Sequence, residues 1–186
     1  MMLSGEDLRK AIAEGSFAIA PFNSASVRPA GVLLHLGATL LKPKAGTVVD
    51  VLNRLSPSYD TIEIKPDAPY LLEPGGFVLG ATYESVTVGA KYGLLIEGRS
   101  TLARVGLTIV QTAMLVYPGH RNRPITLELA NHGPNPILLY PKMKIARAAI
   151  FELLTPSVEA YDDYGKYRKQ EGVGPPVFDD EFLKED

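Results

Sequence analysis

Short hydrophobic runs, many of them alternating with polar residues, recur along most of this chain. They begin after Pro21 and are separated by turn-forming sequences such as residues 73–76 and 117–119. Strands this short at this spacing are typical of a β-barrel or jelly roll and not of βαβ units. We therefore expect a mainly β, jelly-roll-like fold, with strands over residues 31–41, 61–64, 77–88, 92–97, 107–111, 125–130, 137–140 and 144–153.

The first residues predict a short helix instead. Ser4 can cap its N-terminus, and Asp7 follows three residues later. Leu8 and Ile12 share one face, and Gly15 can end the helix. We expect this helix to pack at the edge of the domain.

Composition and charge narrow the class of protein. The 186 residues suffice for one domain, which we place at residues 1–172, with an acidic, mobile tail at 173–186. A net charge of -2 gives no basic surface for nucleic acid, and no long apolar run predicts a membrane span. No cysteine is present, which removes disulfides and thiolate zinc sites. The acidic N-terminal residues do not resemble a signal peptide, so we expect a cytoplasmic protein.

One candidate for chemistry is Glu128, which lies among apolar neighbours in the alternating run 125–133. Burying a carboxylate is unfavourable unless it is paired or used, and burial raises its proton affinity. Such a group is suited to proton transfer near neutral pH. An exposed Glu128 on the polar side of its strand is an equally good explanation of the sequence alone.

A second candidate is the turn over residues 98–104, which holds two arginines and two hydroxyls. The guanidinium groups of Arg99 and Arg104 can bind phosphate oxygens in a bidentate manner. A proton-transfer group together with a turn that can bind phosphate suggests chemistry on a nucleotide. Each residue also has a structural explanation, since both arginines could form surface ion pairs and Ser100 could cap the turn.

These two segments, and others in the same order, resemble the dCTP deaminase family. Residues 98–104, Gly-Arg-Ser-Thr-Leu-Ala-Arg, are similar to the family motif Gly-Arg-Ser-Ser-Leu-Ala-Arg, and residues 126–133 resemble the catalytic strand. The similarity covers nearly the whole chain. Further similar segments are 3–8, 74–80, 139–145 and 166–172, the last of which resembles a phosphate-binding segment.

The resemblance implies both a fold and a reaction. The fold is a dUTPase-like distorted jelly-roll or β-barrel, assembled as a homotrimer. The reaction is a zinc-free hydrolytic deamination of dCTP to dUTP and ammonia, with Mg²⁺ bound through the triphosphate and dCTP and dUTP as the nucleotide partners. In the family a glutamate activates the water that attacks the amino-bearing carbon of cytosine and then passes the proton to ammonia. Glu128 matches that glutamate.

The resemblance extends to further residues. Ser100 and Arg104 match residues that hold the water and the base, and the family places them across a subunit boundary from the position of Glu128. The scattered histidines lack ligand spacing, so we expect no protein-bound metal. The residues matched to substrate binding are Arg99, Thr101, Thr112, Ala113, Tyr117, Thr126, Leu127, Tyr161, Lys166 and Gln170.

The sequence departs from the family at three places, one of which is the absence of the family's usual Thr-Pro-Ser-Arg ending after Gly174. Leu33 and His35 stand where the family has an aspartate and an arginine, which predicts that an ion pair is replaced by packing. Tyr117 stands where the family and the dUTPases have an aspartate beside the deoxyribose. Two alternatives therefore stay open. One is a dUTP diphosphatase or a bifunctional deaminase and diphosphatase, and the other is a non-catalytic nucleotide-binding protein of the same fold.

Overall fold

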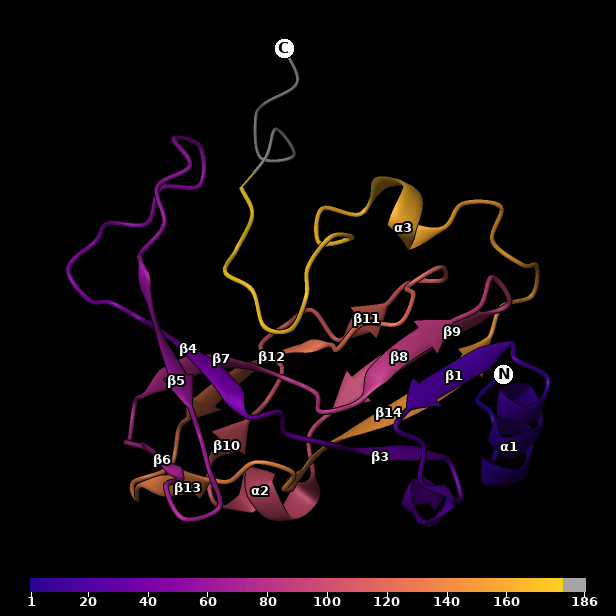
Figure 1. Cartoon of the computed structure of the whole chain (residues 1–186), viewed down its shortest axis with the longest axis horizontal. Helices are drawn as coiled ribbons and strands as arrows, with labels where there is room; N and C mark the ends of the chain where they lie inside the picture. The colour runs from indigo at the N-terminus through magenta and orange to yellow at the C-terminus, as the bar shows by residue number, and fades with distance from the viewer. Residues whose placement is uncertain (179–186) are drawn as a thin grey trace.

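The computed structural model describes residues 1–178 and confirms a mainly β chain with few helices (Figure 1). No helix in these residues is long and apolar enough to cross a membrane. The helices are α1 (Gly5–Ala13), α2 (Ser100–Arg104) and α3 (Tyr161–Tyr164), and a 3-10 turn, η1, spans Ser24–Ser26. The strands are β1 (Phe17–Ala20), β2 (Val27–Arg28), β3 (Gly31–His35), β4 (Thr39–Pro43), β5 (Tyr59–Glu63), β6 (Tyr70–Leu72), β7 (Phe77–Ala81), β8 (Ser85–Val88), β9 (Tyr92–Glu97), β10 (Leu107–Thr108), β11 (Leu115–Val116), β12 (Thr126–Asn131), β13 (Ile137–Leu139) and β14 (Lys144–Glu152).

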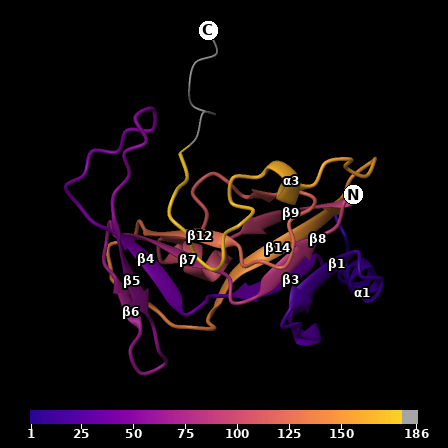
Figure 2. The same ribbon diagram turned by 45° about the horizontal axis from the view of Figure 1, so that its top comes forward.

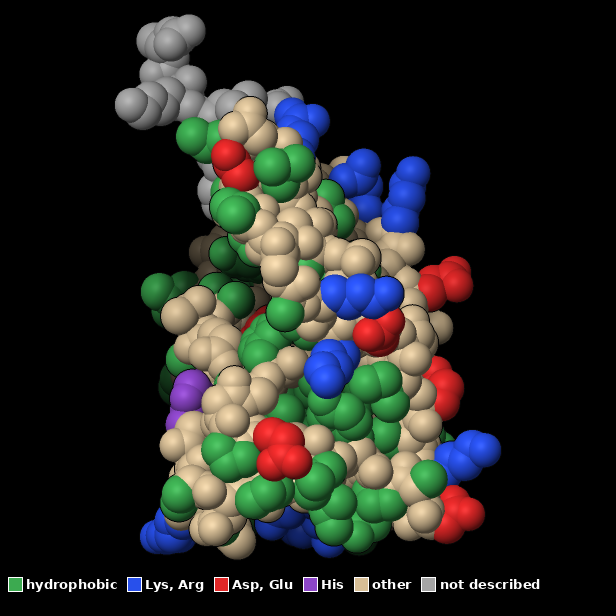
Figure 3. Space-filling model, turned by 90° about the vertical axis from the view of Figure 1, so that its left-hand side faces the viewer, with side chains coloured by type: hydrophobic (Ala, Val, Ile, Leu, Met, Phe, Trp, Pro, Cys, Tyr) green, Lys and Arg blue, Asp and Glu red, His purple; other side chains and the backbone are tan. Residues whose placement is uncertain are grey.

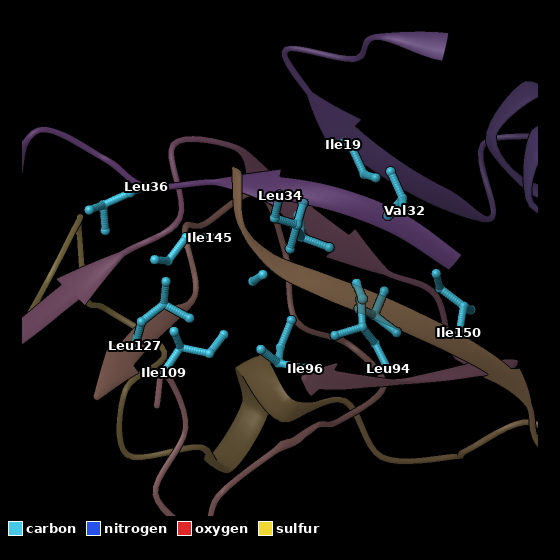
Figure 4. Packing of buried hydrophobic residues seen from close by; sticks show 14 of the residues in the cluster. Ile19, Val32, Leu34, Leu36, Leu94, Ile96, Ile109, Leu127, Ile145 and Ile150 are labelled. Atoms are coloured by element: carbon cyan, nitrogen blue, oxygen red, sulfur yellow. The ribbon is translucent and has the colours of Figure 1, made fainter. Parts of the chain in front are cut away.

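Two five-stranded antiparallel sheets enclose the core. One has the strand order β10-β12-β7-β4-β5 and the other the order β11-β9-β14-β3-β2. Two shorter pairs, β1-β8 and β6-β13, extend the fold (Figures 1 and 2). Figure 4 shows side chains from both large sheets in one cluster, where Leu127 of β12 and Leu34 of β3 are fully buried.

The predicted N-terminal helix is confirmed as α1, which lies at one edge of the fold (Figure 1). The Ser4 hydroxyl accepts a hydrogen bond from the backbone N–H of Asp7 at 3.1 Å, and the Asp7 carboxylate accepts one from the Ser4 N–H at 3.3 Å. This reciprocal capping satisfies two backbone donors that the first helical turn leaves free. Leu8 is fully buried and attaches the helix to the core.

Two of the predicted strands, 31–41 and 77–88, are wrong as continuous elements. Each breaks in two, because the chain passes there from one sheet to another. The two crossings lie side by side, since the Gly37 N–H donates to the Ala81 carbonyl at 2.8 Å and the Tyr83 N–H donates to the His35 carbonyl at 2.7 Å. Strands that bend from one sheet to the next make the corners of such folds. An alternating pattern does not reveal where the bend falls.

The same corner corrects the expectation for His35. Leu33 is buried, with 4% of its surface exposed. His35, however, has a carboxylate partner. The backbone N–H of His35 donates to Glu84 Oε2 at 2.9 Å, and its Nδ1 contacts Glu84 Oε1. Because Glu84 is only 5% exposed, this contact satisfies a carboxylate inside the corner.

The remaining differences concern short elements. The prediction of 92–97 is confirmed as β9, and those of 125–130, 137–140 and 144–153 agree with β12, β13 and β14 to within one residue at each end. The strand predicted at 107–111 stops at Thr108, and the one predicted at 61–64 spans 59–63. The elements β1, β2, β6, β11 and α3 were not predicted. Each has two to four residues, which is too short to give a periodic signal.

The side chain of Asn131 forms hydrogen bonds between the end of β12 and neighbouring segments. Its side chain is fully buried, and Nδ2 donates to the carbonyls of Leu72 at 3.0 Å and Asn135 at 2.8 Å. Its Oδ1 accepts from the Gly133 N–H at 2.9 Å. One amide therefore joins β12, β6 and the turn before β13, and satisfies three backbone groups.

We predict that Asn131→Ala destabilises the fold strongly, because it leaves two carbonyls and one N–H without their partner. Each buried unsatisfied group costs about 1–3 kcal/mol, so the free energy of unfolding should fall by roughly 3 kcal/mol. Urea denaturation at fixed protein concentration measures this change. The control is Asn135→Ala, whose exposed side chain should matter by less than about 0.5 kcal/mol. Equal losses for the two variants would contradict the assigned role.

Candidate active site

Strand β12 sets the position of Glu128. It lies between β10 and β7, and Leu127 and Leu129 point into the core with no exposed surface. Because successive side chains of a strand point to opposite faces, Thr126 and Glu128 share the other face, where both are half-buried. Glu128 therefore lies on the face of the strand away from the core, as the alternative expects, but it is half-buried there and not exposed.

The surroundings of Glu128 favour a proton-transfer group. Burial raises the pKa of its carboxyl above the ordinary value, while the backbone N–H of Gln111 opposes this shift by donating to Oε2 at 3.3 Å. The carboxyl therefore holds a proton more readily than a solvated glutamate does, and it still has a donor that favours its ionised form. A group with these two properties can accept and return a proton near neutral pH.

Gln111 also places two residues that match substrate binding in the family, Thr112 and Ala113, near Glu128. Residues Thr112 and Ala113 follow it directly and are exposed in the link between β10 and β11. Since the Gln111 N–H is bonded to Glu128, this turn begins beside the carboxylate. Gln111 itself was not predicted as a site residue. Its contact with Glu128 is made by the backbone N–H, and a sequence pattern does not predict such a contact.

The predicted turn over residues 98–104 forms helix α2, which begins at Ser100. Its N-cap is Arg99, without a side-chain capping bond, so the prediction that Ser100 caps the turn is wrong. Arg99 Nη1 donates to the Lys144 carbonyl at 3.2 Å. Ser100, Thr101 and Arg104 are exposed, and in residues 1–178 neither arginine of this turn forms an ion pair. The helix thus presents the Arg104 guanidinium and two hydroxyls outward, whereas Arg99 is half-buried.

A single chain does not bring α2 and Glu128 together. Helix α2 packs beside β10 at the lower edge of Figure 1, and within residues 1–178 no hydrogen bond or ion pair joins Ser100 or Arg104 to Glu128. The two halves of the predicted site are therefore not joined by these contacts within the described part of one subunit.

The C-terminal segment, by contrast, lies against the start of β12. Gln170 Nε2 donates to Thr126 Oγ1 at 2.7 Å, and Asp162 forms an ion pair with Arg123. In Figures 1 and 2 the segment passes over the sheet that contains β12 and β7. Of the predicted residues in this segment, Gln170 thereby reaches Thr126 at the start of β12, and Tyr161 and Lys166 precede it in the same segment. Part of the expected tail, residues 179–186, lies outside the described residues.

The ion pair between Arg123 and Asp162 was not predicted. Both side chains are largely buried, with 13% and 20% of their surfaces exposed. Arg123 Nη1 also donates to the Arg168 carbonyl at 2.8 Å, so one arginine binds the segment at two points. The partners are 39 and 45 residues apart in sequence, and nothing in the local patterns connects them.

A cavity of about 400 Å³ lies between the sheet and residues 171–173. Thr39, Thr61, Ala81 and Tyr83 are among the residues that line it, but Glu128 is not. The cavity is therefore separate from the carboxylate within one chain. Among the described residues, no three His, Asp or Glu side chains are grouped so that they could hold a metal ion.

Comparison with known proteins agrees with this fold. A family profile described as dCTP deaminase-like matches residues 2–153. A relative from Bifidobacterium animalis subsp. lactis, named "dCTP deaminase, dUMP-forming", is 35% identical over 180 residues, which are 94% of this chain and 93% of the relative. A protein of the same name from Mycobacterium leprae is 34% identical over 189 residues, covering 99% of each chain.

A solved structure is also similar. It is the 2'-deoxycytidine 5'-triphosphate deaminase from Agrobacterium tumefaciens, with a TM-score of 0.61 and 20% sequence identity. The match covers 80% of this chain but only 47% of that chain, so this protein spans about half the length of that structure. The extent of the family match and the identity to its members leave one conclusion: this chain belongs to the dCTP deaminase-like family.

Proposed function

We propose that this protein deaminates dCTP by hydrolysis, with Glu128 as the general base. The observation that carries the proposal is the half-buried carboxyl of Glu128, whose pKa burial raises, beside the exposed turn 112–113. The family membership supports cytosine nucleotide as the substrate, since the relatives' names specify dCTP.

In the proposed mechanism, Glu128 as carboxylate removes a proton from water. The water oxygen forms a bond to the amino-bearing ring carbon, and Glu128 then returns the proton to the amino nitrogen. The carbon–nitrogen bond breaks and ammonia leaves, while the second water proton passes from the new hydroxyl group to ring N3, so the ring carbon becomes a carbonyl and the product is dUTP. A positioned general base of this kind contributes roughly 100- to 10,000-fold to the rate. Its raised proton affinity is useful because the same group acts as base and then as acid.

The other half of the proposed site comes from a second subunit of a homotrimer. Ser100 and Arg104 are exposed on α2 and do not reach Glu128 in their own chain, so a neighbouring chain must supply them if they act on the water and the base. The surface also favours association. Leu71 of β6 and Leu138 of β13 are paired across the two strands and exposed by 45% and 44%. The side of the molecule on which β6 and β13 lie in Figure 1 carries hydrophobic side chains at its surface (Figure 3).

The triphosphate is proposed to lie beneath the C-terminal segment. Lys166 and Gln170 belong to the stretch that reaches Thr126, and the guanidinium group of Arg99 would face the phosphates from the neighbouring subunit. Mg²⁺ is expected to arrive on the triphosphate as part of the substrate. Phosphate oxygens and water can satisfy its coordination, so the proposal requires no cluster of acidic side chains.

A second candidate adds a step after deamination. The relatives from Bifidobacterium and Mycobacterium are named dUMP-forming, which favours further cleavage of dUTP to dUMP and pyrophosphate. Tyr117 argues against this step, because a phenol is a poorer general base than the carboxylate that the family has at this position. We therefore propose dUTP as the released product.

The first prediction concerns Glu128→Gln, which keeps the shape of the side chain but cannot exchange a proton. Ammonia release from Mg·dCTP should fall by roughly 100- to 10,000-fold. The control is Glu63→Gln, which changes an exposed carboxylate on β5 and should leave turnover near wild type. Turnover of Glu128→Gln within a few-fold of wild type would remove Glu128 from the role. Nucleotide binding without any turnover by the wild type would instead favour a non-catalytic binding protein.

The raised pKa of Glu128 also predicts a pH effect on stability. A carboxyl whose folded pKa is raised contributes stability that is complete below its unfolded pKa and is lost as pH rises through the folded pKa. Glutamine does not ionise. The free energy of unfolding of Glu128→Gln minus that of wild type should therefore grow with pH, starting near the ordinary glutamate value of 4.5. Denaturation curves over this pH range measure the difference, and a constant difference would contradict the burial effect.

The second prediction tests the shared site by mixing two inactive variants. Glu128→Gln and Arg104→Ala should each be inactive alone, but refolding them together should restore activity. In randomly mixed trimers, about a quarter of the shared sites would contain both native residues. The control mixture is Ser100→Ala with Arg104→Ala, whose defects lie on the same helix and should not complement. An inactive first mixture that still forms mixed oligomers would place the whole site within one subunit.

The third prediction concerns the product. With Mg·dCTP, ammonia should be released while dUTP accumulates, with little dUMP or pyrophosphate. Phosphorus NMR of the reaction mixture distinguishes these products directly, and an ammonia assay gives the matching rate. Release of pyrophosphate at the rate of ammonia release would overturn dUTP as the product and establish the dUMP-forming reaction.

A further inference from the structure

The segment that follows β14 carries a cluster of aromatic rings built around Tyr161. The ring of Tyr117 lies parallel to that of Tyr161, with an interplanar angle of 10° and a centroid separation of 6.2 Å. Tyr164 approaches Tyr161 edge-on at 6.1 Å, and His120 lies 6.3 Å away. These separations fall within the range of favourable aromatic pairs. Tyr161 is thus held between the turn that contains Tyr117 and its own helix.

The backbone fits the same junction closely. The Tyr161 N–H donates to the Pro118 carbonyl at 2.8 Å. Gly119 has a φ of +82°, and a side chain there would place its Cβ 2.4 Å from Ala160 Cβ. Turn 117–120 and the start of α3 therefore touch along their backbones as well as through their rings. The two segments therefore pack closely, and a side chain at position 119 would separate them.

The contact between turn 117–120 and α3 lies at the beginning of the segment that contacts β12. After Tyr161, the ion pair of Asp162 with Arg123 and the hydrogen bond from Gln170 to Thr126 continue the attachment. Thr126 lies on the same face of β12 as Glu128. The position of residues 160–170 relative to Glu128 is therefore set first at Tyr117 and then at two later points.

We propose that Tyr117 is a positioning residue that docks residues 160–170 onto the turn before β12, by placing its ring against Tyr161. This proposal rests on the proposed function for its catalytic consequence, because Lys166 and Gln170 are the expected phosphate ligands. A carboxylate at position 117 could not stack on Tyr161. The tyrosine thus gives this chain an attachment that the family's aspartate does not provide, in place of a carboxylate beside the sugar.

The test compares Tyr117→Phe, which keeps the ring, with Tyr117→Leu and Tyr117→Asp, which remove it. Amide hydrogen exchange in the full protein without nucleotide should show faster exchange of residues 160–170 in the Leu and Asp variants and wild-type exchange in the Phe variant. Tyr140→Leu removes an exposed tyrosine elsewhere and should leave these amides unchanged. In turnover of Mg·dCTP, the Leu variant should raise KM by about 2- to 10-fold, the range expected for loss of one aromatic pair, with kcat within about twofold. The Phe variant, which keeps the ring, should have the same KM as the wild type.

Three outcomes would overturn the proposal. The first is exchange of residues 160–170 that does not change in the Leu variant. The second is a Phe variant as defective in KM as the Leu variant, which would assign the role to the hydroxyl and a direct contact with substrate. The third is a lower KM in the Asp variant, which would assign position 117 to sugar recognition. The exchange measurement requires no turnover, so it decides the docking even if deamination proves not to be the reaction.

Discussion

The alternation of side chains along β12 is the constraint on which the rest of the site depends. Leu127 and Leu129 are fully buried between the two large sheets, so the register of this strand is fixed by core packing. A slip of one residue would turn both leucines outward and bury Glu128 in their place. Because that exchange is strongly unfavourable, the position of Glu128 is held by the stability of the core and does not depend on contacts within the site.

The corner between the sheets is bonded directly to the start of this strand. Thr82, in the crossing between β7 and β8, exchanges two hydrogen bonds with Ile125, one through its backbone N–H and one through Oγ1, each at 2.9 Å. The Thr82 hydroxyl in turn donates to the Glu84 carbonyl at 2.6 Å. The contact between His35 and Glu84 therefore belongs to the same network that starts β12. Asn131 forms hydrogen bonds at the other end, so both ends of β12 are held by buried polar groups.

Charge is distributed unevenly over the subunit. The candidate base and the segment with Lys166 and Gln170 lie at one end of β12, whereas Arg104 of the 98–104 turn projects from an exposed helix. An arginine left in water binds phosphate weakly, because water screens its charge. Such a residue becomes an effective ligand only when another surface covers it. The proposed trimer is the arrangement that would bring such a covering surface to Arg104.

The sequence by itself determined the class of fold, the first helix, most of the longer strands and the candidate role of Glu128, because periodicity and a carboxylate among apolar residues are local properties. It also marked Tyr117 as unusual, through comparison with a family motif. Only the tertiary structure decided where the strands bend between sheets, that His35 meets Glu84, and that Tyr117 meets Tyr161. These contacts join residues 44 to 49 positions apart and depend on how the sheets close. Local patterns carry no information about closure, since many pairings of the same short strands would preserve the same alternation.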